Sequence, residues 1–158
     1  MGQDDEAADE EAALLGALLR IPYSAIGEAV ERGLHAAGYP EIGRAHLTVL
    51  QPLFARPEGA RLTDLAAWAH ITKPSMNYLV NHLVAHGYVT READPDDGRA
   101  QRVQLTARGQ AAVRTIRDLV RETEASWAEL IGAEQLAQLR RLLRALAVAL
   151  RGDDAGIG

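Results

Sequence analysis

The sequence predicts a mainly α-helical protein of one domain that carries one small β-hairpin. Apolar residues recur at helical spacing over most of the 158-residue chain. Two short stretches with the character of strands flank a turn-rich segment at residues 94–98. The chain is 47% apolar and 25% charged, as globular proteins are, and its length suits a single core. These three observations define the expected fold class.

Negative charge is concentrated at the N-terminus. Residues 1–11 contain six acidic residues and no basic one, so removing them changes the net charge from −5 to +1. We interpret residues 1–11 as an acidic, flexible tail and residues 12–158 as the domain. The net charge argues only weakly against a nucleic-acid partner, because the positions of Lys and Arg on the surface matter more.

Composition also restricts chemistry and location. The chain contains no cysteine, which excludes disulfides, thiolate metal sites and thiol redox switches. No apolar run approaches the roughly 18 residues of a membrane span, and the N-terminus lacks the order of a signal peptide. We therefore expect a soluble, cytoplasmic protein.

Two helices are predicted before the centre of the chain. The first covers residues 12–37, where Pro22 is expected to kink or divide it. The second covers residues 43–54, and Pro52 is expected to end or bend it near Gln51.

The centre of the chain predicts two short helices joined by a tight connection. Helical patterns at residues 62–70 and 73–86 are separated by two residues, which is the spacing of a helix-turn-helix. Thr72 is a candidate N-cap of the second helix, and Pro74 fits its first turn. Gly87 stands where a left-handed residue commonly ends a helix.

The second of these helices has an apolar face and a polar face. No acidic residue occurs between Ile71 and Tyr88, and the polar face carries amide, hydroxyl and cationic groups that can pair with base edges or phosphates. The alternative is an ordinary solvated amphipathic helix. The candidate DNA contacts on this helix are Lys73, Ser75, Asn77, Tyr78, Asn81 and His82.

A hairpin is predicted next, with strands at residues 88–92 and 99–105. Three arginines, Arg91, Arg99 and Arg102, surround its turn, whose aspartates are expected to accept backbone N–H groups. Arginines at such a tip could enter a minor groove. The alternative is a surface hairpin with compensating charges.

Two long helices complete the predicted order. Thr106 caps the first, which extends to about Glu129, and the second covers residues 133–150. Leucines of the second helix occupy heptad a and d positions, which predicts packing against another helix. These candidate interface residues are Leu136, Leu139, Leu143, Leu146 and Leu150.

Together these motifs resemble the MarR (multiple antibiotic resistance regulator) family of winged helix-turn-helix transcriptional regulators. The order of elements agrees over nearly the whole chain. The resemblance is specific in the segments Leu65-Ala66, Thr72–Leu83, Gly87–Arg91, Asp94–Ala100 and Leu105–Gly109. It implies a DNA-binding lobe at residues 43–106 between dimerisation helices at residues 12–42 and 107–150. It also implies recognition helices in successive major grooves and wing arginines at the minor groove.

The resemblance assigns roles to particular residues. Arg99 matches a wing arginine, but Gly98 stands where the family usually has the first of two arginines. Thr72, Ser75, Asn77, Tyr78 and Asn81 match recognition positions. Similar regulators bind small aromatic or anionic effectors between the dimer helices and the DNA-binding lobe. The candidate pocket residues, for which core filling is the alternative, are Tyr23, His35, Tyr39, His46 and Trp68.

The resemblance thus implies a transcriptional regulator, most simply a repressor that binds a pseudo-palindromic operator as a homodimer. The alternative is a helical adaptor that docks a protein partner through its leucine seam. No nucleophile elbow, phosphate loop or histidine–carboxylate arrangement is present, so we predict no enzymatic activity and no cofactor. His82 and His86 share a helix face, but no third ligand of suitable spacing lies nearby, so no metal site is predicted.

Overall fold

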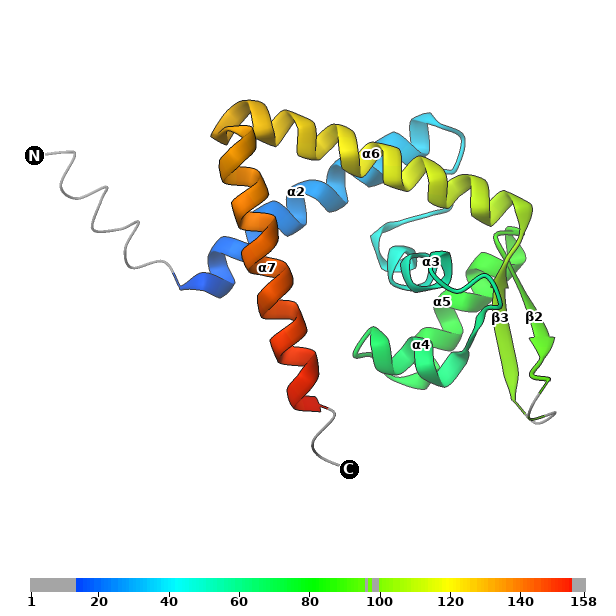
Figure 1. The fold of residues 1–158 in the computed structure, drawn as a ribbon. Coiled ribbons are helices and arrows are strands. Elements are labelled where there is room, and N and C mark those ends of the chain that lie inside the picture. Colours follow the sequence, from blue (N-terminus) through cyan, green and yellow to red (C-terminus); the bar gives the residue numbers. More distant parts are fainter. Residues whose placement is uncertain (1–13, 96, 98–99, 155–158) are drawn as a thin grey trace, which may run out of the picture. The chain divides into compact units, whose positions relative to one another are not determined.

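The computed structural model describes residues 14–95, 97 and 100–154 (Figure 1). The predicted acidic tail at residues 1–11 lies outside the described residues, as do Gly98 and Arg99 in the predicted turn. The chain divides into two compact units, one up to Val120 and one from Arg121, and each is described by itself.

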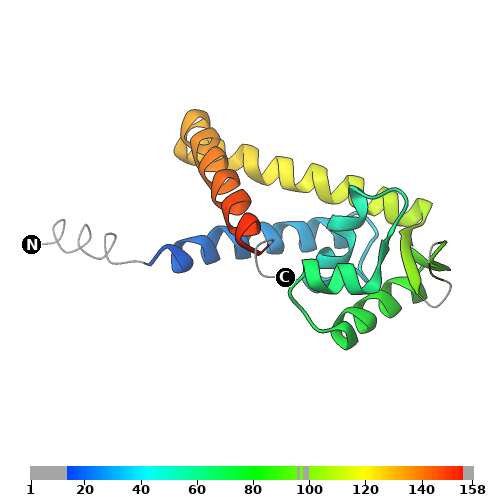
Figure 2. The ribbon, with the colours of Figure 1, turned by 60° about the horizontal axis from the view of Figure 1, so that its bottom comes forward.

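Helices dominate the described chain, and the predicted order of elements is confirmed (Figures 1 and 2). In chain order the elements are α2 (Leu15–Ala36), the 3-10 helix η1 (Arg44–His46), α3 (Leu47–Phe54), β1 (Ala60–Arg61), α4 (Leu62–Trp68), α5 (Lys73–Ala85), β2 (Val89–Ala93), β3 (Gln101–Leu105), α6 (Ala107–Ile131) and α7 (Ala133–Asp154). No helix in the described part of the chain has both the length and the apolar character of a membrane span.

Neither internal proline divides or ends its helix, which was one of the two outcomes expected at each position. Pro22 lies inside α2, which is a single helix, and Pro52 lies inside α3, which continues past Gln51 to Phe54. Each proline removes one backbone hydrogen bond. In α3 that loss is offset by packing, because Pro52 and Leu53 are both buried in the core.

Local capping defines both ends of α5 as predicted. The Thr72 hydroxyl accepts a hydrogen bond from the Ser75 N–H at 3.3 Å, and a proline stands in the first turn. At the other end Gly87 has a φ of +72°. The Tyr88 N–H then donates to the Leu83 carbonyl at 2.9 Å, and the Gly87 N–H donates to that of Val84 at 3.0 Å. This pair of bonds is a Schellman motif.

The sheet has three strands rather than the two that were predicted for the wing. β1 pairs antiparallel with β3, which also pairs antiparallel with β2, so the strand order is β1-β3-β2. Ala60 lies opposite Val103, and Arg61 lies opposite Arg102. A strand of two residues has no visible alternation, which is why the sequence did not reveal it.

The core of the first unit lies among α2, α3, α5, the sheet and the first half of α6. Within this unit the first half of α6 lies beside α2, where Leu119 stands against Gly33. Gly33 permits this approach, because a Cβ atom there would clash with the Leu119 side chain. The largest fully buried side chains are Tyr88, Leu34, Ile42, Leu50, Leu53, Leu65, Met76, Leu83, Val30, Val49, Val80 and Val89.

The second unit consists of the end of α6 and α7. Gly132, with a φ of +93°, makes the turn between them. Arg140 pairs with Glu124 across the two helices at 2.7 Å. Leu136 of the predicted seam is half-buried, whereas the other four leucines remain between 37% and 61% exposed: Leu139, Leu143, Leu146 and Leu150.

Candidate nucleic-acid interface

Helix α5 separates an apolar face from a polar face, as predicted. Met76, Val80 and Leu83 are fully buried in the core. On the opposite side Tyr78 is 74% exposed, and Lys73 is also exposed. Since α5 carries no acidic residue, no side chain on this face repels a polyanion.

The first turn of α5 is already organised by its own side chains. The hydroxyls of Thr72 and Ser75 lie 2.9 Å apart, and the Thr72 oxygen caps the Ser75 N–H. Both residues are exposed, so their capping role leaves them accessible to a ligand. Lys73 stands beside them, where the positive end of the helix dipole also favours an anion.

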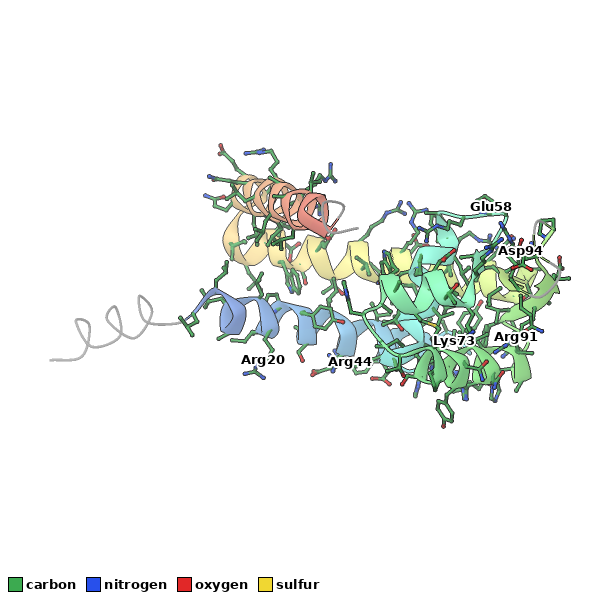
Figure 3. The ribbon with its side chains drawn as sticks, turned by 90° about the horizontal axis from the view of Figure 1, so that it is seen from below. Arg20, Arg44, Glu58, Lys73, Arg91 and Asp94 are labelled. Carbon is green, nitrogen blue, oxygen red and sulfur yellow. The ribbon has the colours of Figure 1, made fainter. Side chains whose placement is uncertain are left out.

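Arg91 joins the wing to α5. From β2 its Nη2 atom lies 2.9 Å from Oδ1 of Asn77 and 2.7 Å from Oδ1 of Asn81. Its Nη1 atom lies 3.1 Å from Oε1 of Gln101 on β3. Figure 3 shows Arg91 close to Lys73, where α5 and the wing meet. Three of the predicted DNA-contact residues are therefore brought together.

A hollow of about 310 Å³ opens at this junction. Its lining contains three cations and no acidic side chain. Arg61 is paired with Asp94, so Lys73 and Arg91 give the hollow a positive potential suited to a phosphate group. It is lined by Arg61, Leu62, Thr63, Lys73, Asn77, Arg91, Ala100 and Gln101.

Arg102, a predicted wing contact, turns towards the interior instead. Its guanidinium lies 3.3 Å from the buried carboxylate of Asp94, which also accepts two hydrogen bonds from Arg61 at 2.8 and 3.0 Å. The bond to Asp94 raises the pKa of Arg61. Asp94 further accepts the backbone N–H of Asp97, three residues on, at 3.2 Å, as expected of an aspartate in this turn. Arg102 thus holds the base of the wing together.

His82 also departs from its predicted place on the DNA-facing side. Its Nε2 atom lies 2.8 Å from the Glu41 carbonyl, and its half-buried ring stacks on His46 with centroids 4.3 Å apart. A carbonyl can only accept, so Nε2 carries the hydrogen. Within the described residues, no group of three or more His, Asp or Glu could hold a metal ion.

Glu41, Tyr88 and Arg108 form a cluster that the sequence did not reveal. The Tyr88 hydroxyl donates to Glu41 at 2.7 Å and accepts from Arg108 at 3.1 Å. The hydrogen bond from Tyr88 lowers the pKa of Glu41, and burial raises the pKa of Tyr88. These three residues connect the loop before η1, the start of the wing and the start of α6.

A second cavity, of about 170 Å³, lies within the first unit between α2, α3 and α6. It has apolar walls, one cation and a few polar groups. Arg44 is bonded there to the Ser24 hydroxyl at 3.3 Å. Its lining residues are Tyr23, Ile26, Gly27, Val30, Arg44, Leu47, Thr48, Gln51, Ile116 and Val120.

The predicted pocket residues are mostly placed elsewhere. Tyr23 lines this cavity, but the other four residues are not in its lining. Tyr39 packs near Tyr88 with ring centroids 6.2 Å apart, and His46 stacks on His82. His35 and Trp68 are exposed on α2 and α4. The principal polar group of the cavity, Arg44, was missed because an isolated arginine has no sequence signature.

A two-helix turn whose second helix is exposed and free of acidic residues, followed by a hairpin, defines a winged helix-turn-helix protein. Comparison with known proteins agrees. The family model described as MarR family matches residues 42–100. Residues 42–100 are thus similar to the MarR family, and the chain is a DNA-binding transcriptional regulator rather than an enzyme.

Several solved structures resemble the chain over nearly its full length. The Mycobacterium tuberculosis MarR family protein Rv2887, in complex with salicylic acid, is 28% identical, with 87% of this chain and 98% of that chain covered and a TM-score of 0.66. The transcriptional repressor CouR, bound to a 23-mer DNA duplex, is 26% identical, with 93% and 96% covered and a TM-score of 0.71. A crystal structure of MarR is 23% identical, with 90% and 96% covered and a TM-score of 0.78.

The histidine stack predicts a loss of stability in mild acid. Burial, and the neighbouring His82, lower the pKa of His46 below its ordinary value. A histidine with a lowered folded-state pKa contributes stability above its unfolded pKa of about 6.5, and that stability is lost as the pH falls through the folded pKa. We expect the melting temperature of the wild type to fall more steeply between pH 7.5 and 5.5 than that of His46→Asn, whose amide oxygen can still accept the Gly43 N–H.

Thermal unfolding over this pH range checks the expectation. His35→Asn is the matched control, because His35 is exposed on α2 and its removal should leave the wild-type pH dependence unchanged. Equal pH slopes for wild type and His46→Asn would contradict the role given to His46.

Proposed function

We propose that this regulator is a repressor that binds a pseudo-palindromic operator as a homodimer and is released by a small aromatic carboxylate. One observation carries the proposal: the exposed, acid-free face of α5 adjoins the positive hollow formed with the wing. Such a surface fits a helix in the major groove with a phosphate held beside its N-terminus. The repressor CouR, similar to this chain in fold and sequence, is bound to a DNA duplex.

A second copy of the chain is the proposed partner of α7. The four exposed seam leucines of α7, Leu139, Leu143, Leu146 and Leu150, repeat at heptad spacing, which suits packing against a helix rather than contact with water. The start of α2 is also apolar and exposed, with Leu15 at 60% and Leu18 at 50%. A two-fold dimer would cover such faces and present two α5 helices to a symmetric operator, about 34–36 Å apart.

The cavity between α2, α3 and α6 is the proposed effector site. Its apolar walls suit an aromatic ring, and the Arg44 guanidinium can hold a carboxylate through charge-assisted hydrogen bonds. Arg44 is 39% exposed, so a ligand can reach it from solvent. Rv2887, with 28% identity, is in complex with salicylic acid, which has this chemistry.

Specific DNA binding is tested with fragments selected from genomic DNA and with random DNA at stated salt concentrations. Lys73→Ala should weaken binding to all sequences and reduce the slope of log affinity against log salt by about 0.9, because one phosphate contact is lost. Arg32→Ala, at an exposed cation of α2, is the control and should leave the slope unchanged. A wild-type protein without any sequence preference would instead favour the adaptor function.

The dimer is tested by placing a charge in the leucine seam. Leu143→Glu should give monomer or aggregate in sedimentation velocity, because an uncompensated charge buried between helices costs several kcal/mol. Gln138→Glu adds the same charge at an exposed position of α7 outside the seam and should remain dimeric. An intact Leu143→Glu dimer would exclude this seam as the interface.

The effector site is tested by titrating salicylate, benzoate and the neutral benzyl alcohol while following Trp68 and Trp127 fluorescence. We expect the two carboxylates to bind. Arg44→Met should lower their affinity about tenfold or more, because a hydrogen bond to a charged group is lost. Arg32→Met is the control. The titration is repeated on the protein–DNA complex, and carboxylate binding that leaves DNA affinity unchanged would reject the effector role.

A further inference from the structure

We propose that Arg91 is a positioning residue that sets the base preference of the recognition helix. It holds the side-chain oxygens of Asn77 and Asn81, so that Asn81, the exposed one of the two, presents its N–H groups rather than its oxygen to DNA. This inference rests on the proposed binding of α5 in the major groove. It concerns which base Asn81 selects, not whether the protein binds DNA.

The orientation of the two amides follows from the chemistry of the guanidinium group. The Nη2 atom of Arg91 lies 2.9 Å from the side chain of Asn77 and 2.7 Å from that of Asn81. An arginine has only donors, so each amide must turn its oxygen towards Arg91. Nη2 carries two hydrogens, and these two short bonds use both of them. The Nδ2 groups of the asparagines therefore point away from Arg91.

Arg91 is itself held in place by the wing. The backbone of Arg91 lies opposite Val103 in the β2–β3 pair, and the Arg91 Nη1 atom donates a hydrogen bond to Oε1 of Gln101 at 3.1 Å. Its Nε atom is buried and has no hydrogen-bond partner among the described residues, so only the bonds of Nη1 and Nη2 hold the guanidinium. Asn77 is half-buried beneath it, whereas Asn81 is exposed. Asn81 is therefore the amide that can reach a base edge.

The bond to Arg91 changes which base Asn81 can pair with. An unconstrained asparagine pairs with adenine in the major groove by donating to N7 and accepting from the N6 amino group. The Asn81 oxygen is bonded to Arg91, and its N–H donors remain free. Guanine offers two acceptors, N7 and O6, and no major-groove donor. The geometry thus favours guanine over adenine at the position that Asn81 contacts.

The experiment measures relative affinity for all four bases at each operator position, for wild type, Asn81→Ala, Arg91→Met and Arg91→Lys. Asn81→Ala identifies the positions that Asn81 reads, and the wild type should prefer guanine there. Arg91→Met should shift the preference towards adenine by about fivefold or more at those positions and leave other positions unchanged. Arg91→Lys keeps the charge but not the planar fork, so it should also lose the guanine preference while retaining the salt dependence.

Further measurements separate positioning from other roles of Arg91. The double variant Arg91→Met/Asn81→Ala should have the base profile of Asn81→Ala alone, because Arg91 acts through that amide. Thermal unfolding shows whether each variant is folded, and Arg91→Lys carries the test if Arg91→Met does not fold.

Two outcomes would overturn the inference while leaving DNA binding intact. One is a uniform loss of affinity in Arg91→Met with a salt slope reduced by about 0.9, which identifies Arg91 as a phosphate contact. The other is a wild-type preference for adenine at the Asn81 positions. An absence of specific binding by the wild type would reject the proposed function, and this inference with it.

Discussion

The first unit depends on the backbone and side chain of Tyr88. Its N–H ends α5 by donating to Leu83, and its carbonyl accepts the Thr106 N–H at 3.0 Å. Gly109 lets α6 approach this carbonyl, because a Cβ atom there would clash with it. The Tyr88 ring is buried, and its hydroxyl donates a hydrogen bond to Glu41, in the loop before η1. One residue therefore sets how the recognition helix, the wing and α6 are joined.

Some charged side chains around the wing bond groups within the protein, and others remain exposed to solvent. Asp94 is buried, so it is stable as a carboxylate only because two arginines bond it, and this use commits Arg61 and Arg102 to the base of the wing. Arg91 is committed in part to the asparagines of α5. Lys73 remains exposed beside the N-terminus of α5. The number of cations in the sequence thus overstates how many are available to phosphates.

Features encoded within a few residues were predictable, and features that join distant segments were not. Thr72, Gly87 and Thr106 cap or end their helices as expected, because each acts on backbone groups within four residues. The bonds of Arg61 to Asp94 and of His82 to the Glu41 carbonyl span 33 and 41 residues, and no spacing rule relates such partners. The correction at His82 arises from such a distant partner, whereas Arg102 bonds Asp94 only 8 residues away, across the hairpin.

The 3-10 helix η1 links the proposed effector cavity to α5. Arg44, the cation of the cavity, begins η1, and His46 ends it. The His46 ring stacks on His82 of α5 at 4.3 Å. A ligand bound to Arg44 is therefore one short helical turn from a side chain packed on α5. Such a ligand lowers DNA affinity only to the extent that it prefers a position of η1 that the DNA-bound α5 does not share. The tight packing of the histidines favours a discrete shift of α5 over a gradual one, because packed contacts deform little before they rearrange.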